Sequence, residues 1–206
     1  MAEKANKVKF NLKNTHYSLL TISEDGTPTF GTPVPMPGSV SISLDANGEP
    51  ENFYADGGVY YVINNNCGYD GDLELALIPE SFRTDVLKET LDSKGVLIEN
   101  SEVELAAFAL LFEFDGDQKH IRHVLYNCSA SRPGIEGKTN EDSKEVQTEK
   151  LSLKAVPLAN GMVKAKTGNT TDATTYADWY KAVYVPAAES DAASQSAAKP
   201  AKAVKE

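Results

Sequence analysis

The sequence predicts a mainly β protein with one or two flanking helices, an α+β fold. Apolar residues alternate with polar ones in several short segments, a period of two that is typical of half-buried strands. Turn-forming Gly, Asn, Asp and Pro residues separate these segments, while only two stretches show helical spacing. Predicted strands therefore outnumber helices by about four to one.

The first predicted element pair is a hairpin. Residues 17–22 and 29–32 read as strands, and residues 24–28 between them form a turn in which Gly26 is free to take a positive φ. Prolines then follow at positions 28, 33, 35 and 37. Because proline donates no ladder hydrogen bond, we expect an edge strand or an extended connector here.

Three further strands are predicted before residue 80. Residues 40–44 alternate Val, Ile and Leu with serine, which indicates one solvated face. Residues 59–63 are β-branched and aromatic, and we expect a buried strand there. Residues 72–77 alternate leucine with acidic residues until Pro79 ends the strand, so its polar face is expected to be acidic.

Two short helices are predicted. Pro79 suits a first helical position, and Phe82, Val86 and Leu87 then share one face of a helix over residues 79–87. The second helix is expected from residue 172 or 173 to residue 184. Its aromatic and apolar face consists of Tyr176, Trp179, Tyr180 and Val183.

The longest predicted strands lie between these helices. Residues 107–115 and 119–131 flank an Asp-Gly-Asp turn and form a long hairpin. Residues 150–155 alternate apolar and polar side chains, and residues 162–166 return after the Asn160–Gly161 turn.

Length and composition favour one domain with an appendage. The chain has 206 residues, with 41% apolar and 24% charged residues, as in soluble globular proteins. We expect a β domain over residues 1–185. Residues 186–206 are rich in alanine and lack large apolar side chains, so they are expected to form a disordered tail.

Charge and targeting signals exclude several classes of protein. The net charge of −10 disfavours a protein that grips DNA or an anionic membrane through a basic surface. No run of about 18 apolar residues occurs, and residues 1–9 do not resemble a signal peptide. Cys67 and Cys128 are expected to be two buried thiols in a reducing compartment.

No catalytic or metal-binding constellation is evident, so we predict neither an enzyme nor a cofactor. His120 and His123 lie three apart on a predicted strand, where alternation points them to opposite faces. The Asp-Gly-Asp runs at 70–72 and 115–117 lack the further carboxylates of a calcium loop. The acidic pair at 141–142 lies in a polar loop rather than on the rigid elements that glycosidase acids require.

A long polar connection covers residues 131–149. Loops of more than about 15 residues are uncommon unless they bind something or are disordered. Eight of the fifteen residues from 136 to 150 are charged. That mixture suits an arm that lies on a neighbouring molecule, and it suits a solvated loop about equally well.

Six sequence blocks occur in order across about residues 6–185: residues 6–14, 53–61, 68–74, 108–117, 122–128 and 141–145. Together these blocks resemble the major tail protein family of long-tailed bacteriophages of Gram-positive hosts. Their combination is more specific than any single block. The alanine-rich tail departs from the family pattern.

The resemblance implies a tail tube protein with a β-sandwich or barrel core. Such a subunit would form homohexameric rings that stack into a tube, the conduit for DNA ejection. Implied partners are further copies of the chain, the tape measure protein, tail terminator or distal tail proteins, and double-stranded DNA that passes without specific binding. The implied location is the virion tail, assembled in the host cytoplasm, with no membrane partner and no cofactor. An acidic wall would let DNA slide, since phosphate is repelled.

We hypothesise that the N-terminal segment and the arm make the contacts between subunits and rings. The interface candidates are Lys7, Lys9, Phe10, Arg132, Ile135, Glu136, Lys138, Glu141, Asp142, Lys144 and Glu145. The candidate lumen-facing acids are Asp70, Asp72 and Glu74.

Two other functions stay open on the sequence. A carbohydrate-binding β-sandwich of a phage tail or cell surface would need exposed aromatics near acidic loops, which Tyr60, Tyr61 and Tyr69 could supply. A buried core is the commoner place for such tyrosines. A glycan hydrolase is the third alternative, and the sequence offers it no clear acid pair.

Overall fold

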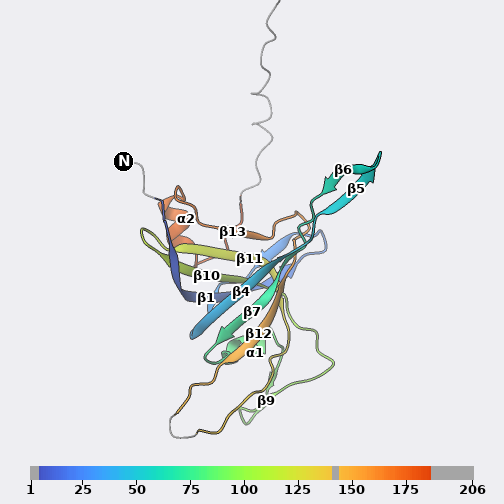
Figure 1. The fold of residues 1–206 in the computed structure, drawn as a ribbon. Helices are drawn as coiled ribbons and strands as arrows, with labels where there is room; N and C mark the ends of the chain where they lie inside the picture. Colours follow the sequence, from blue (N-terminus) through green and yellow to red (C-terminus); the bar gives the residue numbers. More distant parts are fainter. Residues whose placement is uncertain (1–4, 141–143, 187–206) are drawn as a thin grey trace, which may run out of the picture.

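A computed structural model describes residues 5–140 and 144–186 (Figure 1). The fold is mainly β with two short helices, as predicted. In chain order the elements are β1 (Lys9–Ile22), β2 (Pro28–Phe30), β3 (Val34–Pro35), β4 (Ser39–Asn47), β5 (Glu51–Ala55), β6 (Gly58–Ile63), β7 (Gly68–Leu75), α1 (Glu80–Asp85), β8 (Thr90–Leu91), β9 (Leu97–Ile98), β10 (Phe108–Gly116), β11 (Ile121–Ala130), β12 (Glu149–Ala155), β13 (Lys164–Lys166) and α2 (Ala173–Asp178).

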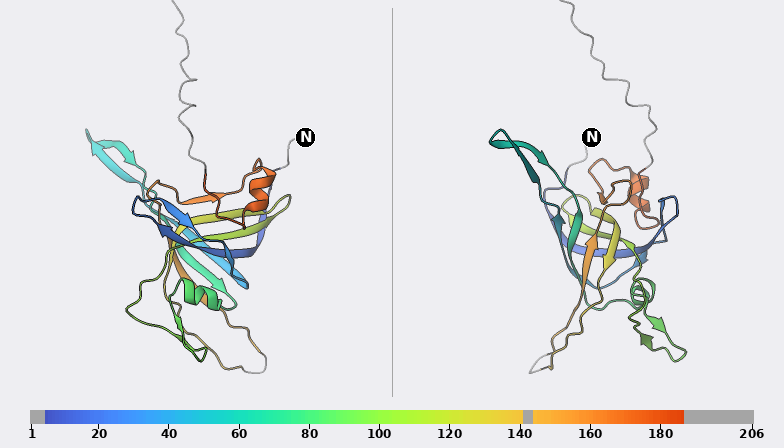
Figure 2. Two further views of the ribbon diagram at one scale, coloured as in Figure 1. Left: turned by 180° about the vertical axis from the view of Figure 1, so that it is seen from behind. Right: turned by 90° about the vertical axis from the view of Figure 1, so that its right-hand side faces the viewer.

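One antiparallel sheet forms the body. Its strand order is β2-β1-β10-β11-β12-β7-β4, with β13 paired to β11 and β3 paired to β1. The sheet curves until its two ends meet: the Met36 amide donates to the Thr15 carbonyl at 2.7 Å, and Ser39 Oγ donates to Thr15 Oγ1 at 2.6 Å. The separate pairs β5–β6 and β8–β9 project from this body in opposite directions (Figures 1 and 2).

The concave face of the sheet holds the larger core. Leucines of β7, β10 and β12 meet there, and α1 closes the space with Phe82, which is fully buried. The Phe82 ring makes edge contacts with Tyr17 and Phe108 at centroid distances of 5.2 and 5.3 Å. The predicted apolar face of the first helix is therefore confirmed.

The other face of β10 and β11 is covered by the chain that follows β13. Asp172 caps α2 by accepting hydrogen bonds from the amides of Thr174 and Thr175. Trp179 and Val183 then pack on this second core and are almost fully buried. Because α2 ends at Asp178 and a turn follows it, the predicted helix to residue 184 is wrong in length, although its packing face is correct.

Both predicted hairpins on the long strands are present, at β1–β2 and at β10–β11. The proline-rich segment forms the short edge strands β2 and β3, as expected. Residues 164–166 pair with β11 and not with the strand before the Asn160–Gly161 turn, because β12 is already paired on both sides.

Four expectations about burial are wrong. Val40 lies at a register shift in the β4–β7 pairing and is exposed, and Leu77 lies beyond the end of β7 and is exposed. Cys128 is buried, but Cys67 is exposed because it lies in the segment between β6 and β7. The largest error concerns residues 59–63, which form β6 and are exposed throughout.

The predicted disordered tail lies outside the described residues, except for Pro186. Within the part of the chain that the structure describes, no helix is long and apolar enough to cross a membrane.

Candidate assembly surfaces

The β5–β6 hairpin is an apolar projection from the body (Figure 2). Its turn consists of Asp56 and Gly57, with φ of 51° and 79°, the Asp-Gly combination that a tight hairpin turn favours. At its base Gly48 touches residues 65 and 67 so closely that a Cβ would lie 2.6 Å from the Asn65 carbonyl oxygen. The base is therefore fixed while the tip is free of the body.

Seven large apolar or aromatic side chains of this hairpin are exposed. Their exposed fractions run from 42% for Val62 to 72% for Tyr60. The set is Phe53, Tyr54, Val59, Tyr60, Tyr61, Val62 and Ile63. This many exposed apolar side chains on one hairpin indicate an interaction site.

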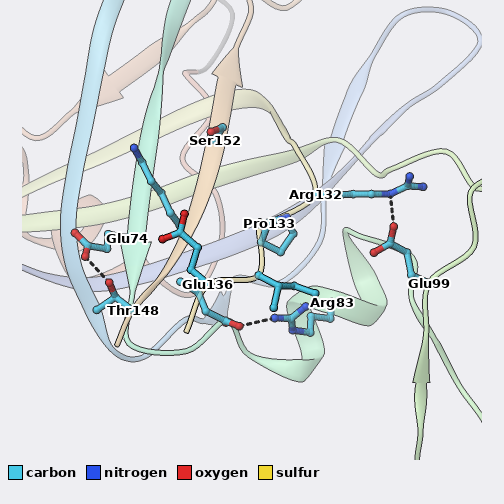
Figure 3. A pocket seen from close by; sticks show the side chains of 12 residues that line it. Glu74, Arg83, Glu99, Arg132, Pro133, Glu136, Thr148 and Ser152 are labelled. Carbon is cyan, nitrogen blue, oxygen red and sulfur yellow. Dashed lines mark hydrogen bonds and ion pairs between the residues drawn. The ribbon is translucent and has the colours of Figure 1, made fainter. Parts of the chain in front are cut away.

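The arm over residues 131–149 lies at the opposite end of the body and borders a groove of about 430 Å³ (Figure 3). Arg132 pairs with Glu99 at 3.1 Å and donates to the Asn100 carbonyl, which ties the arm to the segment after β9. Arg83 of α1 pairs with Glu89 and Glu149 at 3.2 and 2.9 Å. The groove is therefore polar and its arginines are neutralised.

The remaining interface candidates on the arm are exposed where the structure describes them. Ile135 is fully exposed, and the backbone of Lys138 exchanges two hydrogen bonds with the Gln147 side chain. Glu136, Lys144 and Glu145 are also exposed. Glu141 and Asp142 lie outside the described residues.

The N-terminal interface candidates make contacts within the sheet of their own chain. Lys9 and Phe10 belong to β1 and pair with β10, and the Lys7 amide donates to Asp117. Asn6 caps the β10–β11 turn through the amides of Gln118 and Lys119. This segment is therefore part of the sheet of its own chain, and Phe10 remains more than half exposed.

The three acids of β7 lie side by side on its solvated face, and each has partners. Asp72 pairs with Lys150 at 2.9 Å, and Asp70 lies 3.8 Å from Lys154. The bonds from Lys150 and Ser152 lower the pKa of Asp72. Hydrogen bonds from Thr148 and then Ser41 lower the pKa of Glu74. This face stays ionised but is partly neutralised by the lysines of β12.

A hollow of about 330 Å³ opens at one end of the concave face. Phe112, Phe114, His123 and Tyr69 contribute its aromatic lining, and the rings of Phe112 and His123 stack at 5.1 Å. Lys9 lies over the Phe114 ring at 4.6 Å and Lys164 over the Tyr69 ring at 4.2 Å. We call this site the lysine-rimmed hollow.

The electrostatics of the lysine-rimmed hollow are positive. Burial lowers the pKa of His123 to about 4, and the charges of Lys166, Lys9 and Lys164 act in the same direction. His123 is therefore neutral near pH 7. Among the described residues, none of these three lysines forms an ion pair.

A buried charged network fastens the C-terminal segment to the sheet. Glu113, 1% exposed, accepts from Arg122 Nε at 3.0 Å, from Asn14 Nδ2 at 2.6 Å and from the Tyr180 hydroxyl at 3.2 Å. Arg122 also stacks on Tyr176, with its guanidinium carbon 3.9 Å from the ring centroid. Burial and the Glu113 charge raise the pKa of Tyr180. These contacts join Tyr176 and Tyr180 to β10 and β11, so the network has a structural role.

Within the described ranges, no group of three or more His, Cys, Asp or Glu side chains could hold a metal ion. His120 and His123 do lie apart, since His120 pairs with Asp115 at 2.6 Å while His123 faces the hollow. What these surfaces offer is contact area and charge for another molecule.

The sequence reasoning missed both the exposed hairpin and the lysine-rimmed hollow. An Asp-Gly turn between two aromatic runs was the available signal for the hairpin. The hollow assembles residues from β1, β4, β7, β10, β11 and β13, and no sequence spacing could have indicated it.

The sequence matches no family model and no curated protein. Three solved structures are similar to it in part. A chain of the anti-feeding prophage cap, the tube-terminating cap, has a TM-score of 0.44 and 6% identity over 80% of this chain and 95% of that one. A chain of the anti-feeding prophage baseplate has a TM-score of 0.45 and 10% identity over 81% and 99%. A chain of the sheath/tube terminator of an extracellular contractile injection system has a TM-score of 0.37 and 6% identity over 79% and 99%. These values do not assign a function.

Proposed function

We propose that this chain is a structural subunit of a phage tail tube that polymerises as stacked homohexameric rings. The observation that carries the proposal is the pair of projections at opposite ends of one body, the apolar β5–β6 hairpin and the polar arm (Figure 2). A subunit with different contact surfaces at its two ends forms heterologous contacts, which close into rings or extend into filaments. The sequence blocks that resemble the major tail protein family support the same assignment.

The proposal assigns the chain a virion location and no catalytic activity. Its partners would be other copies, the tape measure protein, tail terminator or distal tail proteins, and DNA that passes without specific binding. Lysine partners on β12 leave the β7 acids ionised, so a lumen lined by this face would repel phosphate only moderately.

Electron microscopy of the purified full chain at increasing concentration tests the proposal. We expect rings with sixfold symmetry and, at higher concentration, tubes. Analytical ultracentrifugation of the same samples gives the mass of the assembled species. A chain that remains monomeric at every concentration would contradict the proposal.

Removing residues 134–143 from the arm tests how rings join. The folded body should survive, because the described part of this stretch is exposed and contributes nothing to either core. We expect soluble monomers or rings that do not extend into tubes. Tubes of normal length from this variant would remove the arm from ring stacking.

The lumen assignment has its own test. Replacing Asp72 and Glu74 with lysine should leave tube formation intact, since both carboxylates are on the solvated face of β7. In particles carrying the substitutions, DNA passage should be slower. Unchanged ejection kinetics with intact tubes would place this face away from the lumen.

The exposed tyrosines of the hairpin favour one second candidate, a carbohydrate-binding module. Tyr54, Tyr60 and Tyr61 are each more than 60% exposed, and acidic residues lie nearby in the sequence. Aromatic faces of this kind can stack on sugar rings. Binding to a glycan array by a chain that stays monomeric would favour this candidate over the tube subunit.

A further inference from the structure

We propose that the β5–β6 hairpin of one copy of this chain docks in the lysine-rimmed hollow of the next copy. The inference rests on the proposed self-assembly and specifies which two surfaces meet. The hairpin and the hollow are different surfaces, so each copy would present one of each to its two neighbours.

The hairpin requires a partner for its apolar side chains. A two-stranded hairpin alone is marginally stable in water, and this one has seven large side chains exposed. Phe53 and Tyr60 contact one another edge-to-face at 6.5 Å, which buries little of either. Covering these side chains stabilises both the hairpin and the contact that covers it.

The charge of the hairpin selects a cationic partner. Residues 14–82 contain ten acidic residues and no lysine or arginine. Within and beside the hairpin these acids are Asp45, Glu49, Glu51 and Asp56. A surface that receives the hairpin must therefore supply positive charge as well as apolar area.

The lysine-rimmed hollow supplies both. Its aromatic floor accepts apolar side chains, and its volume is at the lower end of the range typical of ligand pockets, about 300 to 1,000 Å³. Lys164 and Lys166 are exposed on β13, and Lys9 is exposed at the start of β1. Lys9 Nζ lies over the Phe114 ring, and Lys164 Nζ lies over the Tyr69 ring and donates a hydrogen bond to the Tyr69 hydroxyl. Neither ammonium group pairs with a carboxylate of the described residues, so acidic side chains of a neighbour can pair with them.

The groove beside the arm is a poorer receptor. Its cations Arg83, Arg132 and Lys150 are each paired with a carboxylate of the same chain. Its lining also includes Glu74, Glu99, Glu136 and Glu149, which would repel the acidic hairpin. Of these two cavities, the hollow has the charge and the apolar floor that the hairpin needs.

The position of the hairpin favours docking on another copy over its own. Leu44 and Tyr69 of the hollow lie on the strands that flank the hairpin base, whereas the hairpin extends away from the body (Figure 1). When copies dock in a row, one hairpin stays free at one end of the row and one hollow stays free at the other end. That arrangement propagates until a ring closes.

Zero-length cross-linking of the full chain identifies the contact directly. A carbodiimide joins a carboxylate to a lysine amine only when the two groups touch. A mixture of isotopically light and heavy chains, analysed by mass spectrometry, separates links between copies from links within one copy. We expect mixed-label peptides that join Glu49, Glu51 or Asp56 to Lys9, Lys164 or Lys166.

Charge reversal measures the contribution of the contact. Glu49→Lys with Glu51→Lys alters the hairpin, and Lys9→Glu with Lys164→Glu alters the hollow, which both lysines line. Each pair should raise the concentration needed for assembly by about tenfold or more, and their combination in one chain should restore much of the loss. Lys88→Glu with Lys94→Glu is the matched control, because both lysines lie outside the hollow.

The outcomes separate this inference from the proposed function. If the unaltered chain assembles without cross-links between hairpin and hollow, the docking is overturned and the proposed function is not. The same holds if charge reversal in the hollow and in the control affects assembly equally. Links found only within single chains overturn it as well. Absence of any assembly contradicts the proposed function and the docking together.

Discussion

Replacing Trp179 with alanine should destabilise the fold, because this side chain anchors the chain after α2 to the second core. Trp179 is 2% exposed, its ring stacks on Tyr184 at 5.6 Å, and its Nε1 donates to the His123 carbonyl at 3.4 Å. A buried tryptophan removes about 200 Å² from water, which corresponds to about 5 kcal/mol at about 25 cal/mol per Å². Measured losses for such truncations are about 3 to 5 kcal/mol.

Urea or thermal unfolding measures the effect. Circular dichroism is the suitable signal, because the substitution removes the only tryptophan and with it the tryptophan fluorescence. For a domain of this size each kcal/mol lowers the melting temperature by about 2 to 4 °C, so we expect a decrease of about 10 °C. Trp179→Phe should lose less, because the ring is largely kept. Tyr61→Ala, which removes an exposed ring, should leave the stability of the monomer nearly unchanged. An unaltered midpoint for Trp179→Ala would refute the assigned packing.

Other predictions concern the charged network, the thiols, the histidine and the tail. Glu113→Gln should cost about 3 to 5 kcal/mol in chemical denaturation, because it leaves Arg122, whose side chain is only 16% exposed, without its counter-charge; a loss below about 1 kcal/mol would contradict this. Thiol labelling of the native chain should modify exposed Cys67 and spare Cys128, whose pKa burial raises to about 12, and rapid double labelling would oppose the assignment. Because the pKa of His123 is about 4 in the fold, against 6.5 for an unperturbed histidine, its contribution to stability is complete above about pH 6.5 and is lost as pH falls toward 4; His123→Phe should flatten that part of the pH profile. Removing residues 187–206 should leave the melting temperature unchanged, and a large decrease would show that they dock on the body.

The sequence was informative where local chemistry decides structure. Alternation in residues 150–155 reflects the one buried face of β12, and the Asp-Gly-Asp turn correctly indicated the β10–β11 hairpin. Pro79 is not a first helical residue as predicted: it precedes α1 as the N-cap with an extended backbone (ψ 144°), and the helix covers only Glu80–Asp85. The apolar run of β6 was misread, because composition alone cannot distinguish a strand buried in its own chain from one exposed for another molecule.

The candidate surfaces were predicted only in part, because they depend on long-range placement. The arm could be recognised from its length and polarity, and its exposure is confirmed in the described residues. The pairing of Asp72 with Lys150 depends on the register between β7 and β12, which no local pattern determines. The lysine-rimmed hollow depends on the curvature of the whole sheet.

The order in which the strands pair has a consequence for synthesis. β1 has its longest pairing with β10, so the first strand emerges from the ribosome about 100 residues before its main partner exists. The second core cannot form until Trp179 and Val183 have been synthesised, which happens later still. A nascent chain therefore lacks a finished body while its β5–β6 hairpin is already outside the ribosome. In the proposed docking, other chains still being translated on the same messenger would have no completed lysine-rimmed hollow to receive that hairpin, so docking would follow the synthesis of both cores.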